Sequence, residues 1–266
     1  MTSRRRLLTL LFAAPVLCAS SARAGGASVW LEELTSVELR ERIAQGATTV
    51  LVPIGGTEQN GAHLVLGKHN ARVRVLAARI AEQLGDALVA PVVAYVPEGD
   101  IDPPTQHMRH AGTLSVPTAA FESVLEGAAR SLRRHGFRHV VLLGDHGGYQ
   151  TSLVRVAGKL NRAWGGGRGL IALEEYYRAA QAFDATLAAR GYTSQEIGRH
   201  AGLADTSLAW AADAALVRPQ ALMAVPGVDG DPRRASAELG RSGVEHIVSA
   251  SVAAIRASTG RSSSKN

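Results

Sequence analysis

Cysteine is nearly absent from this 266-residue sequence, which contains only Cys18. That residue lies in an N-terminal segment with a basic stretch at residues 4–6, an apolar run at residues 7–14 and small residues at positions 22 and 24. These are the features of an export signal, and the order of the arginines also fits the twin-arginine type. We therefore expect residues 1–24 to be removed, which leaves a mature chain without disulfides, a cysteine nucleophile or a cysteine-bound metal.

Long hydrophobic runs are also missing. The apolar run at residues 7–14 is far shorter than the roughly 20 residues that a membrane-spanning helix needs. A short N-terminal anchor is therefore a weaker interpretation than a cleaved signal. We expect a periplasmic or secreted protein with no stable membrane anchor after signal removal.

Excess charge of one sign is small once the signal is discounted. The formal net charge is +6, and loss of the four arginines at positions 4, 5, 6 and 23 lowers it to +2. Aromatic residues make up 5% of the chain, and no stripe of interleaved basic and aromatic residues is present. The sequence therefore offers no support for a nucleic-acid partner.

Several familiar catalytic motifs are absent as well. The sequence contains no G-x-S-x-G elbow, no G-K-[ST] phosphate loop, no G-x-G-x-x-G after a strand and no H-E-x-x-H helix. These absences remove the usual signatures of serine hydrolases, P-loop proteins, dinucleotide-binding enzymes and zinc proteases.

The chain does show a regular alternation of apolar runs and amphipathic stretches. Runs at residues 48–54, 87–96, 138–143 and 170–173 predict buried strands. Stretches at residues 37–45 (capped by Ser36), 71–84, 118–135, 150–164, 188–216 (with a polar break near Gly191) and 233–255 predict helices. This order favours an α/β fold, a three-layer sandwich with a mostly parallel central sheet and helices on both faces. We expect one domain over residues 25–257 and a flexible tail at residues 258–266.

Candidate catalytic residues lie in two loops that each follow a strand. Glu58 and His69 lie in the loop of residues 55–70, and His146 lies in the loop of residues 144–149. Strand-to-helix loops meet at the carboxyl edge of a parallel sheet, so these side chains are expected to converge. Two imidazoles and one carboxylate suit a catalytic divalent ion that leaves a position open for water. Such an ion would produce a metal-bound hydroxide at neutral pH, which favours hydrolysis.

Gly147 and Gly148 follow this histidine and lead into a helix. Their backbone N–H groups could point at an oxyanion, although a simple tight turn explains the two glycines equally well.

These same residues resemble a known family. Residues 52–64 read V-P-I-G-G-T-E-Q-N-G-A-H-L, which resembles P-x-G-S-x-E-Q-H-G-P-H-L, the opening motif of the creatininase (creatinine amidohydrolase) family. Further similarity lies in A-G-T-L-S at residues 111–115 with His107 upstream, G-D-H-G-G at residues 144–148, H-A-G with D-T-S within residues 200–207, and the segment of residues 230–238. The resemblance covers about residues 29–256.

The resemblance implies an α/β sandwich, a homo-oligomer and a one- or two-metal centre that hydrolyses non-peptide C–N bonds in small cyclic or formylated amides. The family's ligand positions correspond to Glu58, Asn60, His69 and His146. Three positions depart from the family pattern: Asn60 replaces a His, His69 replaces a bridging Asp, and Gly148 replaces a Glu. We therefore expect one divalent ion per chain, Zn or Mn, held by Glu58, His69 and His146.

The remaining expected roles also follow from the resemblance. Asp205 is expected to add a metal ligand or to orient one, and His200 is expected to protonate the leaving nitrogen. Glu58 is expected to take part in catalysis with His200, in addition to binding the metal. Substrate contacts are expected from Asn60, His63, His107, Gly147 and Gly148.

The sequence thus favours an exported, metal-dependent amidohydrolase that acts on a small cyclic amide. Creatinine itself is not favoured, because Ala111, Asp145 and Tyr149 also depart from the family pattern. Two alternatives stay open: a non-hydrolytic member that binds a small ligand or a metal, and a hydrolase of a lactone or cyclic ketone.

Overall fold

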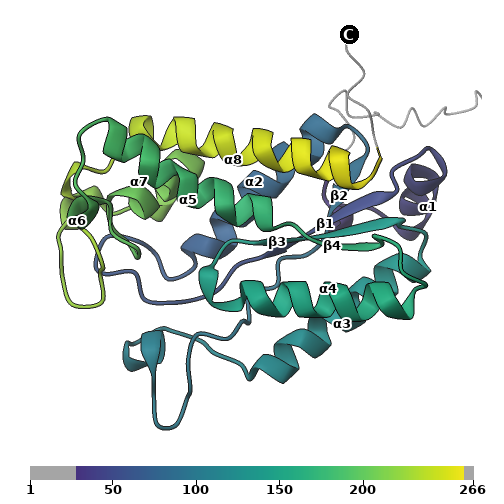
Figure 1. The fold of residues 1–266 in the computed structure, drawn as a ribbon, viewed down its shortest axis with the longest axis horizontal. Helices are drawn as coiled ribbons and strands as arrows, with labels where there is room; N and C mark the ends of the chain where they lie inside the picture. The colour runs from purple at the N-terminus through teal and green to yellow at the C-terminus, as the bar shows by residue number, and fades with distance from the viewer. Residues whose placement is uncertain (1–27, 261–266) are drawn as a thin grey trace, which may run out of the picture.

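The computed structural model describes residues 28–260 (Figure 1). The expected export signal at residues 1–24 and the last six residues of the expected tail lie outside this part of the chain. Within residues 28–260, no helix is both long enough and apolar enough to cross a membrane.

The centre of the fold is a four-stranded parallel sheet in the order β2-β1-β3-β4. Its strands are β1 (Thr49–Ile54), β2 (Ala87–Val89), β3 (His139–Gly144) and β4 (Leu170–Ala172). β1 and β3 are buried almost throughout, because helices cover both faces. Figure 1 shows α3 (Thr118–Arg134) and α4 (Gln150–Ala163) on one side, and α2 (Lys68–Leu84), α5 (Glu174–Ala189) and α8 (Ala237–Ser258) on the other. The predicted three-layer α/β sandwich is confirmed.

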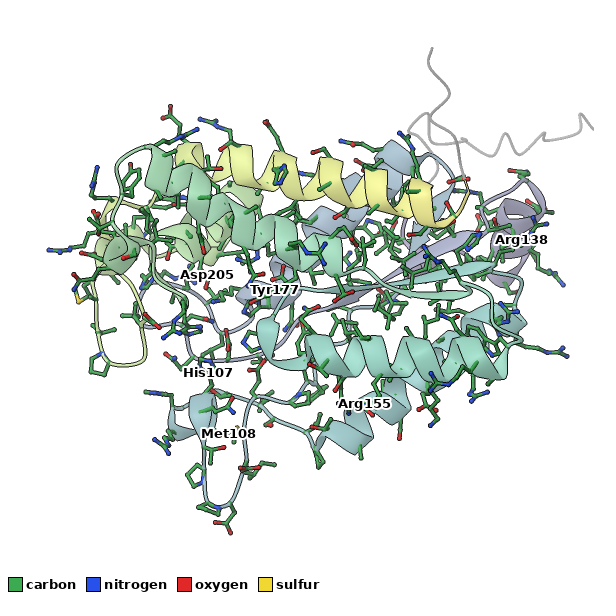
Figure 2. All side chains as sticks on the ribbon, in the orientation of Figure 1. His107, Met108, Arg138, Arg155, Tyr177 and Asp205 are labelled. Atoms are coloured by element: carbon green, nitrogen blue, oxygen red, sulfur yellow. The ribbon has the colours of Figure 1, made fainter. Side chains whose placement is uncertain are left out.

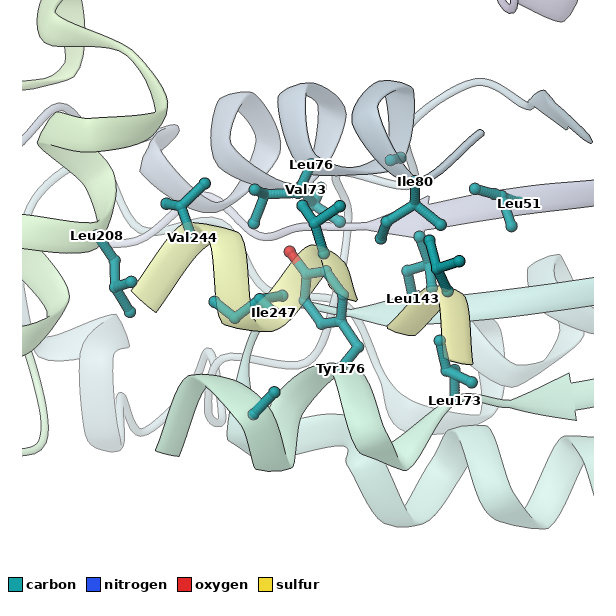
Figure 3. Packing of buried hydrophobic residues seen from close by; sticks show 14 of the residues in the cluster. Leu51, Val73, Leu76, Ile80, Leu143, Leu173, Tyr176, Leu208, Val244 and Ile247 are labelled. Atoms are coloured by element: carbon teal, nitrogen blue, oxygen red, sulfur yellow. The ribbon is translucent and has the colours of Figure 1, made fainter. Parts of the chain in front are cut away.

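Side chains of β1 alternate between two hydrophobic cores, as the period of a strand requires. Val50 and Val52 pack in the core under α3 and α4. Leu51 packs in the other core, with Leu76 of α2 and Ile247 of α8 (Figure 3). The sheet is therefore fixed from both sides, and its carboxyl edge provides a rigid support for the loops that leave it.

Four local predictions need correction. The first helix, α1 (Ser36–Ala44), is capped by Thr35 rather than Ser36, in a capping box with Glu38. The second strand ends at Val89 instead of continuing to residue 96, since Pro91 has no N–H to donate to a ladder. The stretch at residues 188–216 divides into α6 (Ser194–Ile197) and α7 (Leu203–Ala212). The last helix begins at Ala237, after its cap Ser236, and Ser258 is still helical.

One helix was not predicted. The sequence analysis assigns no element to residues 174–187, where the structure has α5. Figure 1 shows α5 leaving the carboxyl end of β4 and extending beyond the sheet. Together with α7, it forms a wall beside the loops that follow β1 and β3.

Candidate metal centre and active site

Four side chains with metal-binding atoms converge at the carboxyl edge of the sheet. Glu58 follows β1, Glu98 lies in the segment after β2, His107 lies in a 3₁₀ turn (Gln106–Arg109), and His146 follows β3. Each side chain offers one ligand atom, and these four atoms lie within 4.8 Å of one another. The two carboxylates are buried, whereas the two imidazoles are partly exposed to the cavity described below.

Three of the four carboxylate oxygens of this cluster lack protein donors. Oε2 of Glu58 and both oxygens of Glu98 are buried without a hydrogen-bond partner. The nearest nitrogens to Glu58 Oε2 are Nε2 of His107 at 3.3 Å and Nε2 of His146 at 3.5 Å. Nδ1 of His146 lies 3.6 Å from Glu98 Oε1. Buried carboxylates without donors are costly, and a bound cation would compensate for that cost.

The electrostatics favour the same conclusion. Burial and the nearby charge of Glu58 raise the pKa of Glu98 to about 8. Burial and the charge of His69 lower the pKa of His146 to about 3, and burial lowers the pKa of His107 as well. Both imidazoles are therefore neutral at pH 7 and offer lone pairs. Two neutral histidines and two carboxylates suit Zn²⁺ or Mn²⁺, so the residues present fit a divalent ion.

Glycine at position 56 makes room for this cluster. Gly56 has φ of 150°, and a Cβ there would lie 2.7 Å from Oε1 of Glu98. Its N–H donates to Oδ1 of Asn70 at 2.9 Å, which holds the start of the loop. The G-G pair after β1 thus allows the loop to pass directly over a buried carboxylate.

A second group of buried charges begins on the first turn of α2. Nζ of Lys68 lies 3.5 Å from Oε1 of Glu58 and also contacts Asp205. His69 lies between two carboxylates, with Nε2 at 2.9 Å from Glu58 Oε1 and Nδ1 at 2.6 Å from Asp145 Oδ2. Burial opposes charge on this ring, but the hydrogen bonds to both carboxylates raise the pKa of His69.

Arg72 completes this group. Its Nε donates to Asp145 Oδ2 at 3.0 Å, and its Nη1 donates to Asp205 Oδ1 at 2.7 Å. The hydroxyl of Tyr176 donates to Asp145 Oδ1 at 2.7 Å. Lys68 and Arg72 thus supply the positive charges that the acidic side chains here require.

This arrangement changes the expected set of metal ligands. Glu58 and His146 belong to the cluster of four, as expected, but His69 and Asp205 are not members of it. Both ring nitrogens of His69 face carboxylates, and Asp205 accepts hydrogen bonds from Lys68, Arg72 and the backbone N–H of Ala201. Glu98 and His107 belong to the cluster instead, and they replace His69 and Asp205 as candidates.

Only some of the residues expected to contact substrate line the cavity. Asn60 and His63 are both buried. Asn60 donates to the carbonyls of Glu58 and Val65. His63 Nε2 lies 3.0 Å from both the Ala201 carbonyl and Thr206 Oγ1. These contacts shape the loop, and neither residue lines the cavity. Gly147 and His107 do line it, whereas Gly148 does not, and its N–H is directed to His146 Nδ1 at 3.3 Å.

His200 is the remaining candidate for proton transfer. Its Nε2 lies 2.9 Å from the Gln59 carbonyl, and its Nδ1 lies 3.6 Å from Glu58 Oε1. Burial and the charge of Lys68 lower the pKa of His200 to about 4. The ring is therefore neutral at pH 7, so it has a free lone pair that can accept a proton.

A cavity of about 280 Å³ opens onto these residues. His107, His146 and His200 form one end of its wall, and Tyr177 and Asp184 of α5 continue it. In Figure 2, His107, Tyr177 and Asp205 mark the region between the upper helices and the lower loop. The volume is suited to a small ligand rather than a folded partner.

Glu98 is the functional candidate that the sequence analysis missed. It follows Pro97 in a segment between the predicted strand of residues 87–96 and the predicted helix of residues 118–135. A signal was available, since this loop also leaves the carboxyl edge of a strand and carries an acidic residue nine positions before His107. That spacing alone does not show that the loop folds back to bring both side chains onto Glu58.

Comparisons with known proteins show similarity to one family. The family model described as creatinine amidohydrolase matches residues 32–255. A mycofactocin precursor peptide peptidase of Mycolicibacterium smegmatis is 38% identical over 109 residues, 39% of this chain and 41% of that protein. The creatinine amidohydrolase of Pseudomonas putida is 31% identical over 131 residues, 49% of each chain. The chain thus spans about half, or less, of the length of these curated relatives.

Solved structures match over a longer part of the chain. A structure titled "Creatininase Mn" has a TM-score of 0.70 and 26% identity, and one titled "E122Q mutant creatininase, Zn-Zn type" has a TM-score of 0.71 and 25% identity. Each match covers 87% of this chain and 98% of the other. The fold is therefore shared with enzymes whose titles name manganese and zinc.

Proposed function

Because the chain belongs to the creatininase family, we propose that it hydrolyses a C–N bond in a small amide with the help of one divalent ion. The observation that carries the proposal is the convergence of Glu58, Glu98, His107 and His146, with three buried carboxylate oxygens that lack partners. When bound, a divalent ion of this class activates water and polarises a carbonyl group. We expect zinc or manganese, since imidazole and carboxylate ligands accept both.

The protein's own groups would perform the remaining steps. Glu58, Glu98, His107 and His146 would hold the ion, and the cavity wall would place the amide carbonyl beside them. Neutral His200 would accept the proton of the attacking water and deliver it to the leaving nitrogen. The hydrogen bond between His200 Nε2 and the Gln59 carbonyl keeps Nδ1 directed toward Glu58.

Lys68 is the reason to propose one ion per chain. Glu58 offers Oε2 to the cluster, while Oε1 faces the Lys68 ammonium and His69. A second divalent ion on Oε1 would have to displace a buried cation that already balances Asp205 and Glu58. The protein therefore supplies its own positive charge on that side of the carboxylate.

For the substrate, we propose a small cyclic amide, which fits the size of the cavity and the activity named for the Pseudomonas relative. Cleavage of a peptide C–N bond is a second candidate, because the mycobacterial relative is named a peptidase and the cavity continues along α5. We also propose export to the periplasm or beyond, and assembly into a homo-oligomer. A hydrolase of lactones or cyclic ketones would release different products from an amidohydrolase, and a non-hydrolytic binder would release none.

Hydrolysis of a substrate panel tests the proposal. The panel contains cyclic amides, short peptides, lactones and cyclic ketones, supplied with Zn²⁺ or Mn²⁺. We expect release of amine or acid from an amide, and a fall in kcat/KM of roughly 100-fold in Glu98→Gln and in His107→Ala. The exposed residues Glu41 and His135 provide matched controls as Glu41→Gln and His135→Ala. Full activity in both ligand variants would contradict the proposal, and ligand-induced stabilisation without any product would favour a binder.

A further inference from the structure

One wall of the cavity is a single face of α5. Tyr177, Ala180, Gln181 and Asp184 all line the cavity. Their spacing of three and four residues places them on the same side of a helix. Tyr177 lies at the inner end, because a Cβ on Gly147, the neighbour of the candidate ligand His146, would meet the Tyr177 hydroxyl at 2.5 Å. Asp184 lies seven residues farther along, about 10 Å along the helix axis at 1.5 Å per residue.

The carboxylate of Asp184 has no partner among the residues that the structure describes: it takes part in no hydrogen bond and no ion pair there. In this part of the chain, three cations line the same cavity. One of them, Arg199, is paired with Asp229, to which its Nε donates at 3.1 Å. Lys68 and Arg72 are already paired with Asp205 and Asp145. Each neighbouring cation therefore has its own carboxylate.

The surroundings make the ionised form of this carboxylate unfavourable. Asp184 is only partly exposed, and burial together with the negative charge of Asp205 raises its pKa to about 6. A half-buried acid without a partner destabilises a fold. A positively charged group that enters the cavity would remove this cost, because it would supply the missing partner.

We propose that Asp184 forms a subsite for a positively charged group of the substrate, an ammonium or guanidinium, about two helical turns from the amide that is cleaved. The proposal rests on the proposed function for the position of the scissile amide at the metal end of the cavity. It implies an extended substrate, such as an amide with an aminoalkyl arm or a basic peptide end. Gln181, one turn nearer the metal end, offers an amide that can donate to or accept from the connecting part.

A matched set of small amides tests the subsite by binding alone. The three compounds are N-(5-aminopentyl)acetamide, N-pentylacetamide and N-(2-aminoethyl)acetamide, titrated calorimetrically into the metal-loaded protein at pH 7.5. We expect the aminopentyl compound to bind roughly tenfold more tightly than the pentyl compound, the size of one charge-assisted contact. The aminoethyl compound is too short to reach Asp184 and should show no such gain.

Two variants assign the preference to the carboxylate. Asp184→Asn should remove the tenfold difference, and Asp184→Glu should retain part of it. Glu174→Gln is the matched control, because it removes the same charge from an exposed position of the same helix that does not line the cavity. Three results would each overturn the subsite. They are equal binding of the amine and the alkyl compound by the wild type, a preference that survives in Asp184→Asn, and no saturable binding of the amine.

The outcome is separable from that of the proposed function. Loss of the amine preference in Asp184→Asn together with no hydrolysis of any amide would support the subsite and refute the hydrolase. Hydrolysis without an amine preference would refute the subsite alone.

Discussion

Glu58 divides its two carboxylate oxygens between two kinds of neighbour. Oε1 faces Lys68 and His69, whereas Oε2 faces His107 and His146 without a hydrogen bond. Burial alone would raise the pKa of this acid, but the charge of Lys68 and the hydrogen bond from His69 hold it well below its usual value. Glu58 is therefore ionised at neutral pH, with one oxygen available for a bound cation.

The buried ammonium of Lys68 is expected to be essential for stability. Lys68→Met keeps most of the side-chain volume but leaves Glu58 and Asp205 short of a partner. Breaking a buried ion pair in this way should lower the free energy of unfolding by about 3–5 kcal/mol, as measured by urea denaturation.

The control for this change is Lys159→Met. Lys159 pairs with Glu126 on the surface, with its side chain 59% exposed, and such pairs contribute roughly 0–1 kcal/mol. Equal destabilisation by the two substitutions would show that Lys68 is not the charge partner we describe.

Asp184 is expected to lower stability at high pH. Its pKa is raised to about 6 in the folded protein, so the folded state binds a proton more tightly than the unfolded state does. The resulting penalty is present above pH 6 and disappears as the pH falls toward the usual value for aspartate. Asp184→Asn should therefore raise the melting temperature at pH 8, and the gain should shrink at pH 4.5.

Thermal denaturation of the wild type and Asp184→Asn at both pH values measures this difference. A loss at pH 8 would mean that Asp184 has a partner in solution, and a gain that is independent of pH would mean that its negative charge is not the cause of the penalty.

Individual site residues could be predicted from sequence only where a motif or a loop position marked them. Glu58, His146 and His200 were identified in this way, and all three lie at the centre of the site. His69 was expected to bind metal, but the sequence does not show that Asp145 would approach within 2.6 Å of its Nδ1. Such long-range pairings depend on how helices pack on the sheet, which local pattern does not encode.

At the level of elements, α7 and α8 depend on close backbone contact. A Cβ on Gly240 of α8 would lie 1.9 Å from the Ser207 carbonyl oxygen of α7, the helix that also carries Asp205. Gly240→Ala should force the helices apart and cost about 1–3 kcal/mol of unfolding free energy.

The matched control is Gly127→Ala in α3. Gly127 is exposed within the helix, and a Cβ there would meet nothing within 4 Å. The same substitution should therefore stabilise the protein by about 0.5–1 kcal/mol, since alanine favours a helix over glycine. Urea denaturation of both variants measures the contrast, and two changes of the same sign would contradict it.

Most elements could be predicted from hydrophobic pattern, because the four strands and the helices of the two cores have clear periodicity. β2 is shorter than predicted, since the apolar residues beyond Val89 continue as an irregular segment that is only partly buried. α5 was missed although Glu174 and Glu175 mark its first turn. That omission matters, because α5 forms the cavity wall.

For the whole molecule, the parallel sheet explains how distant residues form one site. Segments after β1, β2 and β3 leave the same edge, and they bring Glu58, Glu98, His107 and His146 together across 88 positions of sequence. The fold class could be predicted from the alternation of elements and from the family resemblance. The export signal and the oligomeric state remain predictions.

The number of metal ions per chain tests the central claim most directly. Elemental analysis of the purified protein should find roughly one Zn²⁺ or Mn²⁺ per wild-type chain and little in the double variant Glu98→Gln, His107→Ala. The double control Glu41→Gln, His135→Ala should keep the wild-type content. Two ions per wild-type chain, or one ion retained in the ligand variant, would contradict the site that we describe.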